Sequence, residues 1–242
     1  MLSALLSRRG ALPATAAALA LGMLTEPSLA NGRFPAAQFV TVGPGEASDV
    51  IVLRTTFGLV VSVDAGRTWQ WLCEDLFDYG QVTIWDPRLA LGSRGMDGVP
   101  LLVGIPTGLM RTLDRCTATR VPEMAEEFTG DVTTSADGRR VFWVASNGTG
   151  RNRVAASMDG GRTFTFRGAG PEGLLFETIE VAGTDARRVY LTGVTSVGER
   201  RVLFYRSEDG GETLEELPID LRGGVSAFLA ARTGNGASGL AR

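Results

Sequence analysis

One short segment recurs along the chain and constrains its fold more than any other feature. It reads "SVDAGRTW" at residues 62–69, "SMDGGRTF" at 157–164 and "SEDGGETL" at 207–214. A weaker copy, "RTLDRCTATRV", lies between the first two at residues 111–121. The aspartates of these four boxes, Asp64, Asp114, Asp159 and Asp209, follow one another at intervals of about 45 to 50 residues. A fold for this chain must therefore repeat one structural unit about four times.

Each box is accompanied by short segments that are rich in Val, Ile, Phe, Tyr and Thr and bounded by Gly, Asp or Asn. The expected strands are 36–42, 49–56, 58–64 and 68–74, then 81–86, 100–106, 108–114 and 116–121, then 130–136, 139–146, 152–158 and 163–168, and finally 177–183, 184–194, 200–208 and 212–218. A repeat of this length matches one four-stranded propeller blade. The pattern predicts an all-β fold, a β-propeller with the box at the turn between the third and fourth strands of each blade.

The residue types in the box suit a tight turn. An aspartate carboxylate accepts hydrogen bonds from backbone N–H groups ahead of it, and glycine adopts backbone angles that other residues avoid. Ser and Thr add local hydrogen bonds, and the last aromatic residue is expected to pack into the blade. A structural role is therefore predicted for Ser62, Asp64, Gly66, Thr68, Trp69, Asp114, Ser157, Asp159, Gly161, Thr163, Phe164, Ser207, Asp209, Gly211 and Thr213.

These boxes resemble the Asp-box, or BNR, repeat that is shared by sialidases, sortilin-like receptors and the photosystem II assembly factor family. The resemblance covers residues 36–217 and implies a propeller in which the box is a structural turn on the rim. Residues 31–231 are assigned to the propeller, with 223–231 as the first strand of a fifth blade, and 232–242 to a disordered tail. The resemblance favours an incomplete or truncated ring. A small closed ring of four blades, or a ring that needs a partner, stays open.

The first thirty residues have the features of an export signal. Arg8 and Arg9 precede an apolar stretch at 11–24, and Ser28 and Ala30 place small residues before the expected cleavage site. Both the Sec and the twin-arginine routes stay open. The mature chain is expected to begin at Asn31, in the bacterial periplasm or outside the cell, without membrane insertion after cleavage.

The chain has two cysteines, Cys73 and Cys116. Both fall on expected outer strands of neighbouring blades, and export from the cytoplasm favours a disulfide between two such residues. The alternative is two free thiols.

Composition removes several chemistries. The chain has 24 basic residues, all of them Arg, and no His. This excludes a histidine general base, a histidine metal ligand and a Schiff-base lysine. The net charge of -3 gives no reason to expect nucleic acid as a partner. No pattern identifies a catalytic residue, a metal site or a cofactor.

The favoured function is an exported, non-catalytic scaffold that binds an unknown protein or glycan ligand. One alternative is a sialidase-like glycoside hydrolase, for which Tyr79, Tyr190 and Tyr205 are the only candidate nucleophiles. The other alternative is an assembly factor for a membrane complex.

Overall fold

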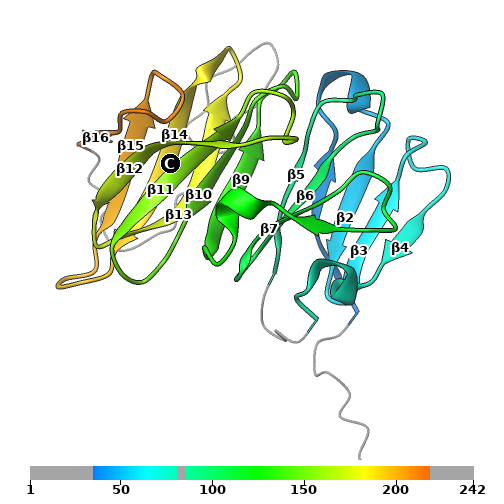
Figure 1. Cartoon of the computed structure of the whole chain (residues 1–242), viewed down its shortest axis with the longest axis horizontal. Helices are drawn as coiled ribbons and strands as arrows, with labels where there is room; N and C mark the ends of the chain where they lie inside the picture. Colours follow the sequence, from blue (N-terminus) through cyan, green and yellow to red (C-terminus); the bar gives the residue numbers. More distant parts are fainter. Residues whose placement is uncertain (1–34, 81–85, 219–242) are drawn as a thin grey trace, which may run out of the picture. The chain divides into compact units, whose positions relative to one another are not determined.

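The computed structural model describes residues 35–80 and 86–218 (Figure 1). The expected signal at 1–30, fifth-blade strand at 223–231 and tail at 232–242 lie outside these residues and stay predictions. Within them the chain forms four antiparallel sheets of four strands each. The prediction of an all-β fold built from four-stranded blades is confirmed.

In every sheet the four strands pair in chain order. Sheet 1 contains β1 (Ala37–Val42), β2 (Ile51–Thr55), β3 (Gly58–Ser62) and β4 (Gln70–Leu72). Sheet 2 contains β5 (Arg88–Leu91), β6 (Leu101–Ile105), β7 (Gly108–Thr112) and β8 (Thr119–Arg120). Sheet 3 contains β9 (Thr129–Thr134), β10 (Val141–Ala145), β11 (Arg151–Ser157) and β12 (Thr165–Glu172). Sheet 4 contains β13 (Leu174–Ala182), β14 (Asp185–Thr195), β15 (Val202–Ser207) and β16 (Glu215–Leu217). The only helices in the described part are three single turns: η1 (Gly45–Ala47), η2 (Glu74–Phe77) and η3 (Pro122–Met124).

One expected strand was misplaced. The first strand of sheet 2 is β5, at Arg88–Leu91, whereas the sequence pattern favoured 81–86. Of that range, residues 81–85 lie outside the described residues. The strand begins directly after Pro87, which has no N–H to donate to a ladder and therefore suits a strand boundary.

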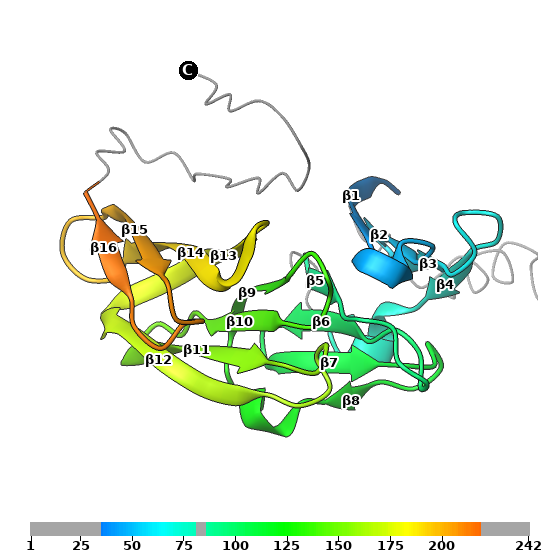
Figure 2. The ribbon, with the colours of Figure 1, turned by 90° about the horizontal axis from the view of Figure 1, so that it is seen from above.

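The core lies between successive sheets. Side chains along a strand point alternately to its two faces, so one strand contributes to the core on each side of its sheet. On β10, Trp143 belongs to the cluster shared by sheets 2 and 3, while the adjacent Phe142 belongs to the cluster shared by sheets 3 and 4. A third cluster, which includes Leu59 and Leu101, joins sheets 1 and 2. Figure 2 shows the sheets from above. In the described residues no core cluster joins sheet 4 to sheet 1, so the sheets do not form a closed ring there.

The first strands of the four sheets follow one another in space. Contacts join β1 to β5, β5 to β9, and β9 to β13. Each of these strands pairs with only one partner in its own sheet, namely the second strand. Their other edges are free to line a common space, which contains the site described below.

Candidate functional site: the box turns and the central cavity

The box turn of sheet 3 shows how the aspartate is used. Asp159 Oδ1 accepts hydrogen bonds from the backbone N–H groups of Arg162 and Thr163, at 3.0 and 2.9 Å, and Oδ2 accepts one from the Thr163 hydroxyl at 2.6 Å. The Ser157 hydroxyl donates to Asp159 at 2.7 Å and accepts from the N–H of Gly161 at 2.7 Å. The carboxylate is occupied on both oxygens by groups of its own turn.

The same bonds recur at Asp64 and Asp209. In each box the threonine four residues ahead donates its N–H to one carboxylate oxygen and its hydroxyl to the other. Hydrogen bonds from Thr68 lower the pKa of Asp64 to about 2, and those from Thr213 lower the pKa of Asp209 to about 2. Burial raises the pKa of Asp159, but bonds from Thr163, Ser157 and Arg162 outweigh it and leave the pKa below its usual value.

The degenerate box in sheet 2 keeps these bonds with different residues. Thr112 takes the place of serine and accepts from the N–H of Arg115 at 2.9 Å, and Asp114 accepts from the N–H and hydroxyl of Thr117. Hydrogen bonds from Thr117 and Cys116 lower the pKa of Asp114 to about 2. Arg115 has a φ of 61°, a left-handed conformation that sheets 3 and 4 give to glycine. Sequence reasoning missed Thr112. The signal was present, because Thr112 is a hydroxyl residue two positions before its aspartate, as the serine is in the other boxes.

The last residue of the box behaves differently in sheets 1 and 3. Phe164 is 4% exposed and belongs to the cluster shared by sheets 2 and 3. Trp69 is 44% exposed, and its indole N–H donates to the Gly66 carbonyl at 3.1 Å. The expectation that Trp69 packs into its blade was wrong, because no sheet of the described residues precedes sheet 1 and covers that side.

The box turns also join neighbouring sheets. A Cβ added to Gly161 would lie 2.7 Å from Leu102 Cδ1 of sheet 2. Arg162 forms an ion pair with Asp97 at 2.5 Å and donates to the Gly98 carbonyl. In sheet 4, Glu212 pairs with Arg167 of sheet 3 at 2.6 Å. Each of these boxes therefore packs against the sheet before it in the chain.

Both cysteines are free thiols in the structure, so the expected disulfide between Cys73 and Cys116 is not formed there. Cys116 lies in the box turn before β8, where its N–H donates to Asp114. Cys73 comes after β4 and caps η2, at the strand end away from the box. The two residues are at opposite ends of their outer strands. This placement, which spacing alone does not reveal, accounts for the missing bond.

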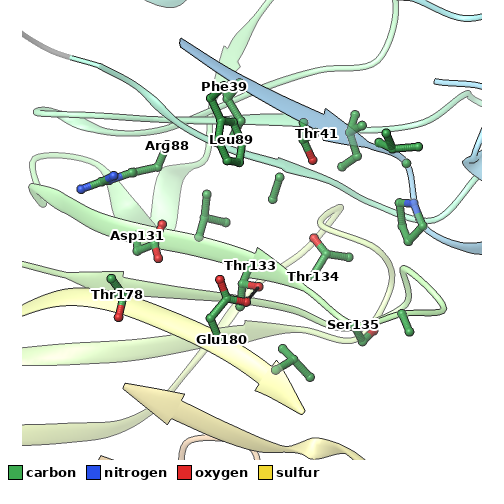
Figure 3. A pocket seen from close by; sticks show the side chains of 18 of the residues that line it. Phe39, Thr41, Arg88, Leu89, Asp131, Thr133, Thr134, Ser135, Thr178 and Glu180 are labelled. Carbon is green, nitrogen blue, oxygen red and sulfur yellow. Dashed lines mark hydrogen bonds between the residues drawn. The ribbon is translucent and has the colours of Figure 1, made fainter. Parts of the chain in front are cut away.

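A cavity of about 740 Å³ lies where the first strands of the four sheets meet (Figure 3). All four strands contribute side chains, and hydroxyl and charged groups are common among them. The lining includes Phe39, Thr41, Arg88, Asp131, Thr133, Thr178 and Glu180. An open space of this size, lined by several elements with a few converging polar groups, is the usual form of a ligand site.

Two carboxyl groups from neighbouring strands face this cavity. Asp131 on β9 accepts a hydrogen bond from the backbone N–H of Ile179 on β13, at 3.0 Å. Glu180 on β13 accepts one from the Thr133 hydroxyl on β9, at 3.2 Å. Figure 3 shows Thr133 and Glu180 beside each other, with Asp131 further along β9. Asp131 and Glu180 are both partly buried.

The cavity raises the pKa values of this pair, whereas the box turns lower the pKa values of their aspartates. Burial raises the pKa of Asp131 to about 6, against the hydrogen bond from Ile179 and the charge of Arg88. Burial and the neighbouring Asp131 charge raise the pKa of Glu180 to about 7. Near neutral pH the pair can therefore gain or lose a proton, whereas the box aspartates stay ionised.

Sequence reasoning missed Asp131 and Glu180 because it treated the first strands only as parts of the fold. A signal was present: each is an acidic residue within a first strand, at nearly the same distance before the aspartate of its box.

Comparison with known proteins supports the architecture. No family model matches the chain, and no curated protein matches it. Among solved structures, the GH74 enzyme of Niastella koreensis aligns with a TM-score of 0.53 and 14% identity, over 74% of this chain and 29% of the other. The GH74 xyloglucanase of Xanthomonas campestris aligns with a TM-score of 0.52 and 15% identity, over 76% and 30%. The chain thus spans less than a third of the length of these two proteins.

The chain has the fold of a β-propeller. Its identity to these neighbours is too low to transfer an activity. A structure entitled YCF48 bound to D1 peptide also aligns, with a TM-score of 0.42, 17% identity and coverage of 81% and 56%. A likeness of that degree carries no argument about this chain.

The tyrosines of this propeller lie away from its cavity. None of Tyr79, Tyr190 and Tyr205 is among the residues that line it. Tyr205 donates its hydroxyl to Glu216 at 3.3 Å in sheet 4, but burial and Glu216 raise its pKa to about 12, which opposes use as a nucleophile. The geometry gives a sialidase-like tyrosine mechanism no support at the cavity.

The described residues lack the features of two other classes of site. No cluster of three or more Cys, Asp or Glu side chains in this part of the propeller is placed to hold a metal ion. No helix there is long and apolar enough to cross a membrane.

Proposed function

We propose that this chain is an exported β-propeller binding module whose central cavity takes a basic side chain of a protein ligand. The observation that carries the proposal is the pair of carboxyl groups, Asp131 and Glu180, inside a cavity of about 740 Å³. Export rests on the signal features of residues 1–30. N-terminal sequencing of the protein from the cell envelope should begin at Asn31, and finding Met1 would contradict it.

The state of Glu180 supports a cationic ligand. Among the described residues no arginine forms an ion pair with it, and its hydrogen bond comes from the neutral Thr133 hydroxyl. A carboxylate in a partly buried site is stabilised by an opposite charge at close range. A guanidinium or ammonium group from a ligand would supply that charge and displace a proton from the pair.

The rest of the lining favours a peptide over a bare ion. Thr41, Thr133 and Thr178 offer hydroxyl groups that donate and accept hydrogen bonds. Phe39 offers an aromatic face, and the guanidinium of Arg54 lies 5.4 Å from the centre of its ring. Such a surface suits a chain segment that presents a basic side chain together with backbone amides.

The test adds one of two peptides, acetyl-Gly-Arg-Gly-amide or acetyl-Gly-Gln-Gly-amide, to a protein of residues 31–242. NMR follows the chemical shifts of the protein's backbone amides. The arginine peptide should shift Asp131, Thr133 and Glu180 saturably at pH 8, and more weakly at pH 5, where the pair is protonated. Glu180→Gln should abolish the shifts, while Glu172→Gln, on exposed β12, should keep them. Equal shifts with both peptides, or none with either, would contradict the proposal.

A further inference from the structure

The outer face of sheet 1 is defined here by one row of paired residues and two residues beside it. Val40, Leu53, Val60 and Trp71 pair in register across β1 to β4 and therefore point to the same side. Val42 and Ile51 extend the row, and Val42 also lines the cavity. Val40 and Trp71 are 54% and 57% exposed. The only charged strand residue of this sheet, Arg54, directly follows Leu53 on β2 and therefore points to the opposite face.

Equivalent positions in the other sheets are covered. The residue four positions before the box aspartate is Met110, Ala155 or Tyr205 in sheets 2 to 4, and each of these is buried against the preceding sheet. In sheet 1 that residue is Val60, which is only partly buried. Sheet 1 thus has the side chains of a covered face without the cover.

The box of sheet 1 shows the same difference. A Cβ on Gly161 or Gly211 would meet Leu102 or Val154 of the preceding sheet, whereas one on Gly66 would meet only Trp69 and Ile51 of its own sheet. Arg162 and Glu212 form ion pairs with the preceding sheet. Arg67 occupies their position in sheet 1, is exposed, and forms no ion pair within the described residues.

Sheet 4 carries the complementary surface. Tyr190 pairs with Arg206, and Thr192 with Phe204, so all four point to the side away from sheet 3, which we call the outer face of sheet 4. Glu215 and Leu217 complete these rows on β16. Thr192 and Phe204 are buried within the chain, at 1% and 8% exposure, whereas Tyr190 and Leu217 are partly exposed. No core cluster of the described residues includes a residue of this face.

One residue of the outer face of sheet 4 matches a residue of sheet 2 that receives the box of sheet 3. Three positions before its box aspartate, sheet 2 has Arg111, which donates to the carbonyls of Gly161 and Arg162 in the next box. Sheet 4 has Arg206 at that position. Arg206 forms ion pairs with Glu208 and Glu215, whose side chains are 46% and 64% exposed, and Glu208 also pairs with Arg188. These exposed carboxylates are opposite in charge to Arg67, which forms no ion pair within the described residues.

We propose that two copies of this chain associate head to tail, with the outer face of sheet 1 in each copy packed on the outer face of sheet 4 in the other. A twofold axis closes such an arrangement with two identical interfaces. The apolar row of sheet 1 covers Tyr190 and Leu217. Arg67 meets the acidic side chains of sheet 4, and Arg206 meets the box carbonyls of sheet 1.

The test is analytical ultracentrifugation of residues 31–242 over a concentration series. The wild type should sediment at twice the monomer mass. Val40→Asp and Arg206→Glu should each give monomers with a retained β-sheet circular dichroism spectrum. Trp71→Ser and Leu217→Ser form a second pair if either first variant fails to fold. Val197→Asp, at an exposed position in the β14–β15 turn, is the matched control and should remain dimeric.

Mixing the two monomeric variants decides the geometry. Val40→Asp keeps an intact sheet 4 face and Arg206→Glu keeps an intact sheet 1 face, so one interface re-forms and a mixed dimer should appear. A monomeric wild type would overturn the proposal. So would a mixture that stays monomeric. An Arg206→Glu variant that stays dimeric beside a monomeric Val40→Asp variant would overturn it as well, because that result indicates sheet 1 packed on sheet 1. Dimerisation that appears only after deletion of 219–242 would also overturn it, because that segment would then be the occupant.

Discussion

The aspartates of the box turns and the acids of the central cavity are the same chemical group in two opposite situations. Asp209 accepts hydrogen bonds from two backbone N–H groups and two hydroxyls of its own turn, so the charged form is favoured. Glu180 is partly buried and lies beside another acid, and only one hydroxyl bond opposes these two effects, so the neutral form is favoured. Residues that support the fold have their partners within the chain, whereas those facing the cavity have room for a partner from outside.

This difference gives the two groups opposite effects on stability. The box aspartates have pKa values below those of the unfolded chain. Their contribution to the free energy of unfolding is therefore present above about pH 4 and is lost as pH falls toward 2. Glu180 has a raised pKa, so its contribution is present below about pH 4.5 and is lost as pH rises through about 7. Acid should reduce the stability that the box aspartates contribute, and neutral pH should reduce the stability that Glu180 contributes.

The largest expected effect tests the boxes as inter-sheet contacts. Gly161→Ala places a Cβ 2.7 Å from Leu102 at a φ of 90°, which should lower the free energy of unfolding by about 2–4 kcal/mol. Gly148→Ala is the matched control, since nothing lies within 4 Å of its added Cβ. Urea titration measures both. If Gly161→Ala lowered the free energy of unfolding by less than Gly148→Ala does, the box would not hold sheet 3 on sheet 2.

The next effect tests the cavity. Glu180→Gln removes a carboxyl group whose ionisation opposes folding, so the variant should gain roughly 1–3 kcal/mol relative to wild type between pH 5 and pH 8. Urea titrations at the two pH values measure the change, and Glu172→Gln is the control. A difference between variant and wild type that stays constant with pH would remove the contrast between the two regions.

Much of the fold could be predicted from the sequence because it depends on local chemistry that repeats. The box letters determine a turn, and the alternating strands around Asp159 or Asp209 determine a sheet. The cavity could not be predicted in this way, because Asp131 and Glu180 come from strands that meet only after the sheets have packed. The exposure of Trp69 likewise depends on which sheet stands next to it.

A smaller effect tests whether the box carboxylate is structural. Asp159→Ala leaves the N–H groups of Arg162 and Thr163 without their acceptor, at a cost on the order of 1 kcal/mol because the turn is open to water. Glu199→Ala, at an exposed position, is the control. Unchanged thermal stability together with lost binding of the arginine peptide would assign Asp159 to the ligand site instead.

The smallest effect refines the comparison among the boxes. Arg115 adopts a φ of 61° where sheets 3 and 4 have glycine, so Arg115→Gly should raise the free energy of unfolding by up to about 1 kcal/mol. Differential scanning calorimetry of the variant and wild type measures this. A lower melting temperature would show that the Arg115 side chain contributes more than its backbone strain costs.

The central claim is that the cavity acids and the box acids differ in their surroundings, and one titration tests it directly. In a single sample labelled with 13C at the carboxyl carbons, NMR follows Asp131, Glu180 and Asp209 from acid to neutral pH. The account predicts apparent pKa values of about 6 and about 7 for the pair, which titrates as a unit, and about 2 for Asp209. If all three carboxyl groups titrated near 4, the cavity pair would be ordinary surface acids and the proposed ligand site would lose its basis.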